Sequence, residues 1–205
     1  MPISEKKHPT TVEGISFFNG FLRHPQQVGS VVPSSRYLKN HIIELADIRT
    51  ASSIIELGPG TGGTTRAFLN AMRPDARLLV IEINPDFISL LNHIRDPRLA
   101  VHHGNACDLV KILDQHQMTP PDVIVSGIPF STMSLDFGQS IVMAIAQVLA
   151  SEGRFLAYQV RDRVKKLGDR VLGPAHVEFE LLNIPPIHLY CWSKNTGPCK
   201  PRDVF

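Results

Sequence analysis

The residues of this chain that are best suited to chemistry lie in a glycine-rich turn. Residues 54–63 read Ile-Ile-Glu-Leu-Gly-Pro-Gly-Thr-Gly-Gly, so an apolar run ends in an acid and passes directly into glycines. A helix-like segment follows over residues 64–72. Glycines allow sharp bends and let a backbone approach a ligand where a Cβ would collide. A strand, a glycine turn and a helix in this order predict a cofactor site of the nucleotide type.

Two kinds of cofactor fit this turn. The spacing Gly58-x-Gly60-x-x-Gly63 matches the dinucleotide fingerprint, although this match alone is weak. Glu56 instead favours a cationic ligand, because a buried carboxylate would repel a pyrophosphate. No Gly-Lys-Ser/Thr follows the glycines, which excludes a P-loop. Glu82, about 20 residues past the turn, is suited to binding the ribose hydroxyls of either cofactor.

Apolar runs and helical segments alternate around the turn. The expected strands are residues 54–57, 78–83, 99–103, 123–126, 154–159, 178–183 and 187–192. The expected helices between them are residues 64–72, 85–94, 106–113, 135–150 and 161–172. Strands separated by helices predict an α/β fold with a parallel sheet covered on both faces. Only Pro185-Pro186 joins the last two strands, which is too short for a crossover, so these strands should pair antiparallel.

Size and composition fit a single globular domain. The chain has 205 residues, of which 43% are hydrophobic and 20% charged, as is usual for soluble proteins. A net charge of +2 is too small to require a nucleic acid, but it is compatible with an anionic surface. The three cysteines form no Cys-x-x-Cys pair, so we expect neither a structural disulfide nor a zinc site, and a reducing cytoplasm. The scattered histidines predict no metal, and no apolar run reaches the roughly 18 residues of a membrane span.

An aromatic-rich helix is expected ahead of the cofactor site. Apolar residues recur there at helical spacing: Val12, Ile15, Phe17, Phe18, Phe21 and Leu22. With Arg23 beside it, this stripe suits a helix lying in the headgroup region of a membrane, although a helix packed on its own domain would show the same stripe. We therefore divide the chain into a membrane-interaction and cofactor-covering segment, residues 1–35, and a catalytic domain, residues 36–205.

The turn with its preceding acid resembles the S-adenosylmethionine motif of class I methyltransferases, whose seven-stranded Rossmann-like sheet also ends in an antiparallel strand. His-Gly-Asn-Ala at residues 103–106 resembles the Gly-Asp-Ala element that holds the adenine amino group, and Asn105 keeps an acceptor oxygen. The resemblance implies S-adenosylmethionine as cofactor and S-adenosylhomocysteine as product. The implied cofactor residues are Glu56, Gly58, Gly60, Thr61, Gly62, Glu82, Ile83, Asn105, Ala106, Ser126 and Ser34.

The segment after the fourth strand bears on the methyl acceptor. Amino-group methyltransferases that act on bases carry Asn/Asp-Pro-Pro-Tyr/Phe here, and the rRNA adenine dimethyltransferases carry Asn-Leu-Pro-Tyr. This chain has Gly-Ile-Pro-Phe at residues 127–130. It keeps the carbonyl of Gly127 and the ring of Phe130 but lacks the polar side chain, which weakens the case for base methylation.

A more specific resemblance lies further upstream. Phe-Leu-Arg-His-Pro at residues 21–25 and Val-Gly-Ser-Val-Val-Pro-Ser-Ser at residues 28–35 resemble the N-terminal signature of bacterial soluble phospholipid N-methyltransferases. The resemblance covers about residues 15–192. It implies methylation of phosphatidylethanolamine towards phosphatidylcholine, or of ornithine lipids, by a cytoplasmic enzyme at the inner face of the cell membrane. The implied partners are the phospholipid and an anionic membrane surface, with no nucleic acid and no obligate protein partner.

Several residues are candidates for contact with a lipid headgroup. Tyr158, at the end of the fifth strand, is the best polar candidate, although it would serve equally as a core tyrosine. With Phe130, Tyr37 and Trp192 it would form an aromatic cage for a methylated cation, although aromatic residues at such positions are commonly packing residues. A basic cluster that suits an anionic membrane, or simply a solvated helix face, contains Arg161, Arg163, Lys165, Lys166 and Arg170.

Three functions remain open on these grounds. The first is a phospholipid N-methyltransferase. The second is an rRNA or other nucleic-acid amine methyltransferase, which predicts a strongly basic groove and an added RNA-binding domain. The third is a non-enzymatic membrane-binding module that retains the cofactor fold, and the acids Glu56 and Glu82 argue against it.

Overall fold

The computed structural model describes residues 34–195 and residue 199 of the chain. The expected membrane helix, with Phe17, Phe18, Phe21 and Arg23, lies outside the described residues, as does nearly all of the segment 1–35. None of the described helices is both long and apolar enough to cross a bilayer.

The described residues form alternating strands and helices. The strands are β1 (Ser53–Leu57), β2 (Arg77–Glu82), β3 (Leu99–His103), β4 (Val123–Ser126), β5 (Arg154–Gln159), β6 (His176–Glu180) and β7 (Ile187–Ser193). The α-helices are α2 (Arg36–Leu45), α3 (Gly63–Ala71), α4 (Pro85–Leu91), α5 (Leu109–Gln115), α6 (Leu135–Val148) and α7 (Arg163–Leu172). Short 3-10 helices are η2 (Ala106–Asp108) and η3 (Phe130–Thr132).

The seven strands form one sheet in the order β3-β2-β1-β4-β5-β7-β6. Strands β1 to β5 run parallel, and β7 lies antiparallel to both β5 and β6. The predicted α/β sheet with an antiparallel end is therefore confirmed. The predicted sixth strand, residues 178–183, is displaced, because β6 ends at Glu180 and the apolar residues after it form a turn.

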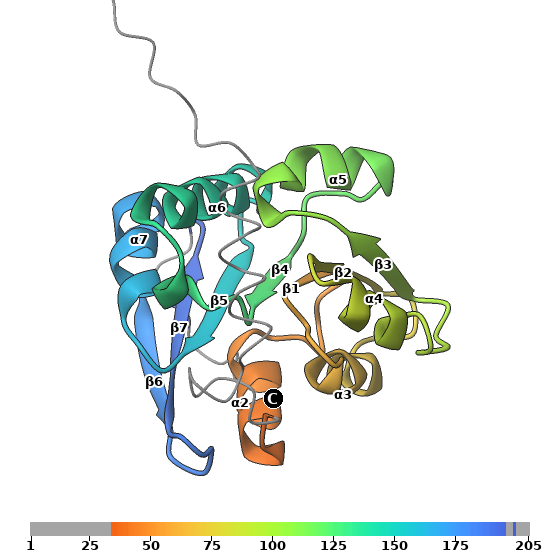
Figure 1. Ribbon diagram of the computed structural model, residues 1–205, viewed down its shortest axis with the longest axis horizontal. Coiled ribbons are helices and arrows are strands. Elements are labelled where there is room, and N and C mark those ends of the chain that lie inside the picture. The colour runs from red at the N-terminus through yellow and green to blue at the C-terminus, as the bar shows by residue number, and fades with distance from the viewer. Residues whose placement is uncertain (1–33, 196–198, 200–205) are drawn as a thin grey trace, which may run out of the picture.

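Helices cover both faces of the sheet, with α2, α3 and α4 on one face and α5, α6 and α7 on the other (Figure 1). Each layer encloses a cluster of buried apolar residues. In the α5–α7 layer the Phe155 ring stacks on Trp192 at a centroid distance of 5.0 Å. Trp192 is 1% exposed and its Nε1 donates to Asp169, so this residue belongs to the core.

Helix α2 is attached to the far edge of the sheet. Its N-cap is Ser35, whose Oγ accepts a hydrogen bond from the amide of Leu38. Further along the helix, the His41 ring contacts the carboxylates of Glu178 and Glu180 on β6. Burial alone would lower the pKa of His41, but the two carboxylates raise it above its usual value. The start of the described chain is thus joined to its last hairpin.

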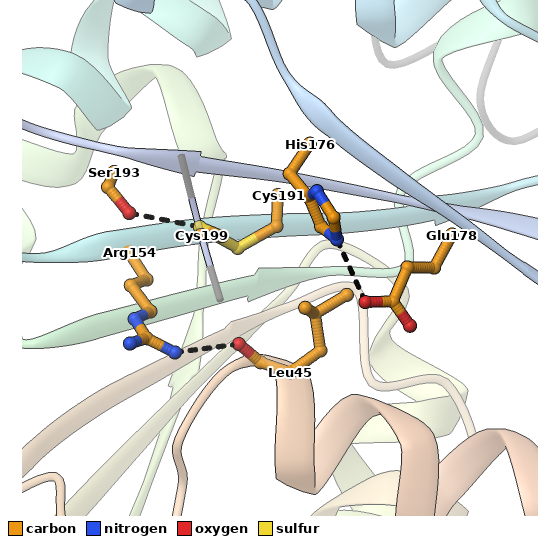
Figure 2. The surroundings of a disulfide bond; sticks show 7 residues. All are labelled: Leu45, Arg154, His176, Glu178, Cys191, Ser193 and Cys199. Atoms are coloured by element: carbon orange, nitrogen blue, oxygen red, sulfur yellow. Dashed lines mark hydrogen bonds and ion pairs between the residues drawn. A yellow bond between two sulfur atoms is a disulfide. The ribbon is translucent and has the colours of Figure 1, made fainter. Parts of the chain in front are cut away.

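A disulfide joins Cys191 on β7 to Cys199, with their Cα atoms 5.9 Å apart (Figure 2). The expectation that the chain has no structural disulfide is therefore wrong. A separation of eight residues matches no motif, and the position of Cys199 beside Cys191 and Ser193 of β7 is what brings the two sulfurs together. The argument from cysteine usage to a reducing compartment accordingly no longer applies.

Candidate active site

The glycine turn connects β1 to α3 and lies at the carboxyl ends of the parallel strands. Gly58, Gly60 and Gly62 all have a positive φ, between 58° and 79°. A Cβ at Gly58 would lie 3.1 Å from Cγ1 of Ile128, so this residue is constrained both by its conformation and by the neighbouring segment. The turn therefore passes close beneath the segment that follows β4.

Glu82 ends β2 and fixes the shape of the turn. Its carboxylate is 3% exposed and accepts backbone hydrogen bonds from Gly60 at 3.1 Å, Ile83 at 2.9 Å and Asn84 at 3.0 Å. Burial raises the pKa of Glu82, and the three backbone donors oppose that rise. One carboxylate thus joins the glycine turn to the loop after β2, and its remaining lone pairs suit ribose hydroxyls.

A pocket opens beside Glu82. The space between its walls, counted out into the solvent at its mouth, is about 410 Å³. Five residues expected at the cofactor line it: Gly58, Glu82, Ile83, Asn105 and Ala106. Six further residues line it: Gly104 of the His-Gly-Asn-Ala element, Ile128 of the segment after β4, and Ile81, Met133, Phe137 and Ile141, which the sequence did not indicate. A mostly apolar pocket with one carboxylate and one amide suits a flat heteroaromatic ring with its attached sugar.

Asn105 has a local role in addition to lining the pocket. Its Oδ1 accepts a hydrogen bond of 3.0 Å from the amide of Cys107 and so caps helix η2. A carbonyl oxygen has two lone pairs, so the same atom retains capacity for an amino-group donor. The residues present therefore fit the adenosine part of S-adenosylmethionine.

Glu56 lies behind the turn and does not line the pocket. It is 0% exposed, and its carboxylate accepts hydrogen bonds from the hydroxyls of Thr64 and, at 2.6 Å, Thr65. Burial raises the pKa of Glu56 to about 7; the two threonines oppose this rise, and the charge of Glu82 adds to it. A cationic group bound nearby would favour the ionised form of both acids, which fits the charge of S-adenosylmethionine.

This linkage predicts that cofactor binding depends on pH. A bound cation lowers the pKa of Glu56 from about 7, so binding releases protons and affinity falls by up to about tenfold per pH unit below that value. Calorimetry between pH 5.5 and 8.5, in buffers of different ionisation enthalpy, would measure both the affinity and the proton release. In the variant Glu56→Gln, cofactor affinity should depend less on pH than in the wild type. The same pH dependence in both proteins would refute the role of Glu56.

The segment around Gly127 lies against the glycine turn, and its Ile128 lines the pocket, whereas Gly127 and Tyr158 do not. A Cβ at Gly127 would collide with the hydroxyl of Tyr158 and lie 3.0 Å from the carbonyl oxygen of Gly58. The Tyr158 hydroxyl thus occupies the space into which a side chain at residue 127 would extend. Burial raises the pKa of Tyr158, the negative charge of Glu56 raises it further, and a hydrogen bond with Thr64 opposes both, so the phenol stays protonated.

Two buried side chains support this segment. Ser126 is 0% exposed, and its Oγ accepts a hydrogen bond from the amide of Ile128, so it shapes the turn rather than facing the pocket. Gln159 was not anticipated as a site residue. Its Nε2 donates to the carbonyl of Ile128 at 2.8 Å from the neighbouring strand β5. Only the pairing of β4 with β5 could have revealed this contact.

The proposed aromatic cage does not form. Phe130 and Trp192 are 0% and 1% exposed, so both rings pack in the core. Tyr158 packs with the α2–α4 layer and Trp192 with the α5–α7 layer, on opposite faces of the sheet. Tyr37 is exposed on α2 with the Arg36 guanidinium over its ring. Alternation of side chains along β5 and β7 separates these residues.

The remaining candidates are dispersed. Thr61 is exposed in the turn, and half-buried Ser34 precedes α2 without lining the pocket. Lys165 pairs with Asp169 within α7 and Lys166 pairs with Asp162 at the N-cap of the same helix, so two cations of the expected basic cluster are neutralised. Arg161 is exposed in the segment between β5 and α7. Among residues 34–195 and 199, no group of three or more His, Cys, Asp or Glu side chains could hold a metal ion.

Comparisons with known proteins agree with this geometry. A family model described as ribosomal RNA adenine dimethylase matches residues 27–157. An ornithine lipid N-methyltransferase of Singulisphaera acidiphila is 29% identical over 177 residues, covering 85% of this chain and 92% of that protein.

Solved structures show the same fold. The O-methyltransferase TomG of Streptomyces achromogenes, in complex with S-adenosylmethionine, has a TM-score of 0.60 at 16% identity and covers 92% of this chain and 91% of its own. TrmN of Thermus thermophilus has a TM-score of 0.63 at 16% identity and covers 88% of this chain and 53% of its own. The sheet is therefore that of the class I methyltransferases.

Proposed function

The chain belongs to the ribosomal RNA adenine dimethylase family and is an S-adenosylmethionine-dependent methyltransferase, and we propose that its methyl acceptor is the amine of a membrane lipid. An ornithine lipid is the first candidate and phosphatidylethanolamine the second, since each presents a primary amine beside an anionic group. The similarity to an ornithine lipid N-methyltransferase over nearly its whole length supports the lipid class.

The observation that carries this proposal is the pairing of Gly127 with Tyr158. Methyltransferases of bases place an amide or carboxylate side chain at this position, where it binds the exocyclic amine of the base. Here a protonated phenol takes that space, and the amide is absent. A single hydroxyl suits an alkyl amine, because such an amine is not part of a ring with further hydrogen-bonding groups. Phe130 is also fully buried, so its ring is not free to stack on a base.

The residues divide the work as follows. Glu82 would hold the ribose, the apolar pocket with Asn105 would hold the adenine, and Glu56 would stabilise the positive end of the cofactor. When bound, S-adenosylmethionine would supply a methyl carbon to which the amine nitrogen bonds while the carbon–sulfur bond breaks, and S-adenosylhomocysteine would leave with that electron pair. The amine must be neutral for this, and its pKa resembles that of lysine, about 10, so a proton must first leave to water. The Tyr158 hydroxyl then accepts an N–H hydrogen bond and orients the lone pair.

Methyl transfer to lipid and to RNA can be compared directly. The full chain is incubated with methyl-labelled cofactor and vesicles that contain an ornithine lipid, phosphatidylethanolamine or only phosphatidylcholine, and separately with ribosomal RNA. We expect label in the two amino lipids, none in phosphatidylcholine vesicles and none in RNA. Mass spectrometry of the lipid extract then counts the methyl groups added. Label confined to RNA would refute the lipid proposal.

A further inference from the structure

We propose that the turn between β6 and β7, residues 181–186, is a preformed membrane-docking surface, which we call the docking turn; the inference rests on the lipid acceptor proposed above. Leu181, Leu182 and Ile184 are 68%, 61% and 79% exposed. Within the described part of the chain, no other large hydrophobic side chain has so great an exposed fraction. Isolated exposed apolar residues are ordinary, but three within four residues mark a contact surface.

The docking turn holds its apolar residues outward by means of an inward polar one. Asn183 is 4% exposed; its Oδ1 accepts a hydrogen bond of 3.0 Å from the amide of Ser35, and its Nδ2 donates to the carbonyl of Pro185 at 2.9 Å. The amide of Leu182 donates to Glu180 at 2.8 Å. The usual arrangement of polar residues outside and apolar residues inside is therefore reversed by specific bonds, and the exposed residues belong to a defined conformation.

The docking turn projects from the same end of the sheet as the active site, where the parallel strands have their carboxyl ends. Strands β5 and β6 run in the same direction, because each is antiparallel to β7, so the turn after β6 lies at the same end of the sheet as the end of β5. The glycine turn and Gly127 follow β1 and β4 at this end, and the loop from β6 to β7 extends beyond it in Figure 1. Val160, directly after β5, adds a further apolar side chain that is 44% exposed.

The surroundings of the turn favour a lipid interface over a protein partner. The bond from Ser35 to Asn183 places the start of α2 beside the turn. There Tyr37 is 42% exposed and Arg36 is stacked over its ring, 4.8 Å from the centroid. An aromatic ring and a guanidinium bordering aliphatic side chains match the polarity gradient from hydrocarbon to phosphate headgroup.

Acidic side chains near the turn do not oppose this assignment. The carboxylates of Glu178 and Glu180 contact His41, and Glu180 also accepts the amide of Leu182. Both carboxylates therefore face His41 on α2 and not the membrane surface that the turn would contact. With the aliphatic tips in the lipid, the site above them would meet an amine at the level of the headgroups.

The test compares two triple variants of the full chain. Leu181→Ser, Leu182→Ser and Ile184→Ser together remove the tips of the turn. The matched control combines Leu90→Ser, Val110→Ser and Met143→Ser, which replaces exposed apolar residues on α4, α5 and α6 that do not line the cofactor pocket. Flotation with vesicles of phosphatidylethanolamine, phosphatidylglycerol and an ornithine lipid should show at least about tenfold weaker binding for the turn variant only. Equal flotation of both variants would overturn the docking assignment.

A second measurement separates this inference from the proposed function. Both variants are given a short-chain, water-soluble form of the amino lipid as acceptor. We expect the turn variant to methylate this soluble lipid like the wild type and to lose activity only on vesicles. If no lipid form is methylated by any variant, the proposed function fails while flotation still decides the docking. Sedimentation equilibrium without lipid is the last measurement. If the wild type is a dimer and the turn variant a monomer, the turn is a contact between copies of the chain, and the inference is overturned.

Discussion

Replacing Glu82 by alanine is expected to weaken S-adenosylmethionine binding by about 100-fold. The carboxylate accepts three backbone hydrogen bonds and holds the glycine turn against the loop after β2. Loss of charge-assisted bonds to the ribose, together with a loosened turn, corresponds to about 3 kcal/mol. Isothermal calorimetry with the cofactor measures the change directly.

Two further variants make this result specific. Glu82→Gln keeps the length and one acceptor oxygen, so its affinity should lie between those of the wild type and the alanine variant. Asp75→Ala removes an exposed acid from the turn before β2 and should leave affinity unchanged. Circular dichroism checks that the sheet persists in each protein. Normal affinity in a folded Glu82→Ala protein would show that the cofactor binds elsewhere.

The second large effect concerns Tyr158. We expect Tyr158→Phe to reduce turnover with an amino lipid by about 10- to 100-fold while leaving cofactor affinity unchanged, because it removes one positioning contact with the amine. The matched control is Tyr190→Phe, which removes a buried tyrosine hydroxyl on the opposite face of the sheet. Steady-state kinetics with separate KM values for lipid and cofactor distinguishes a positioning loss from misfolding. Equal turnover of Tyr158→Phe and the wild type would remove Tyr158 from the site.

A variant of Gly127 tests the same geometry from the other side. Gly127→Ala places a methyl group against the Tyr158 hydroxyl and should impair turnover strongly. In the Tyr158→Phe background the oxygen atom is absent, so Gly127→Ala should reduce turnover by a smaller factor than it does in the wild type. Independent, additive effects of the two substitutions would contradict the contact between these residues.

The cofactor half of the site was accessible from sequence because it depends on local order. A strand, an acid, glycines and a helix are adjacent in the chain, and Glu82 and Asn105 follow the next two strands at the same edge. The sequence did not indicate Met133, Phe137 and Ile141 in the pocket wall, because no local motif distinguishes an apolar lining residue from a core residue. Only the placement of η3 and α6 over the sheet makes them lining residues.

The acceptor half depends on strand register and was reached only in part. The sequence names Tyr158 only as a candidate, and its contact with Gly127 depends on the pairing of β4 with β5. The cage failed because alternation along a strand places Trp192 and Tyr158 on opposite faces. Residues 181–183 of the docking turn were predicted as the end of a strand, because an apolar run has the same pattern whether it is buried or exposed.

The bond between Asn183 and Ser35 also limits how this region can change over evolutionary time. The amide must reach a helix start 148 residues earlier in the chain, so the turn cannot gain or lose a residue without losing that bond. The side chains at its tip carry no such restriction, because they touch little of the protein. The fold therefore constrains the length of the turn, whereas only the proposed contact with lipid constrains the side chains at its tip.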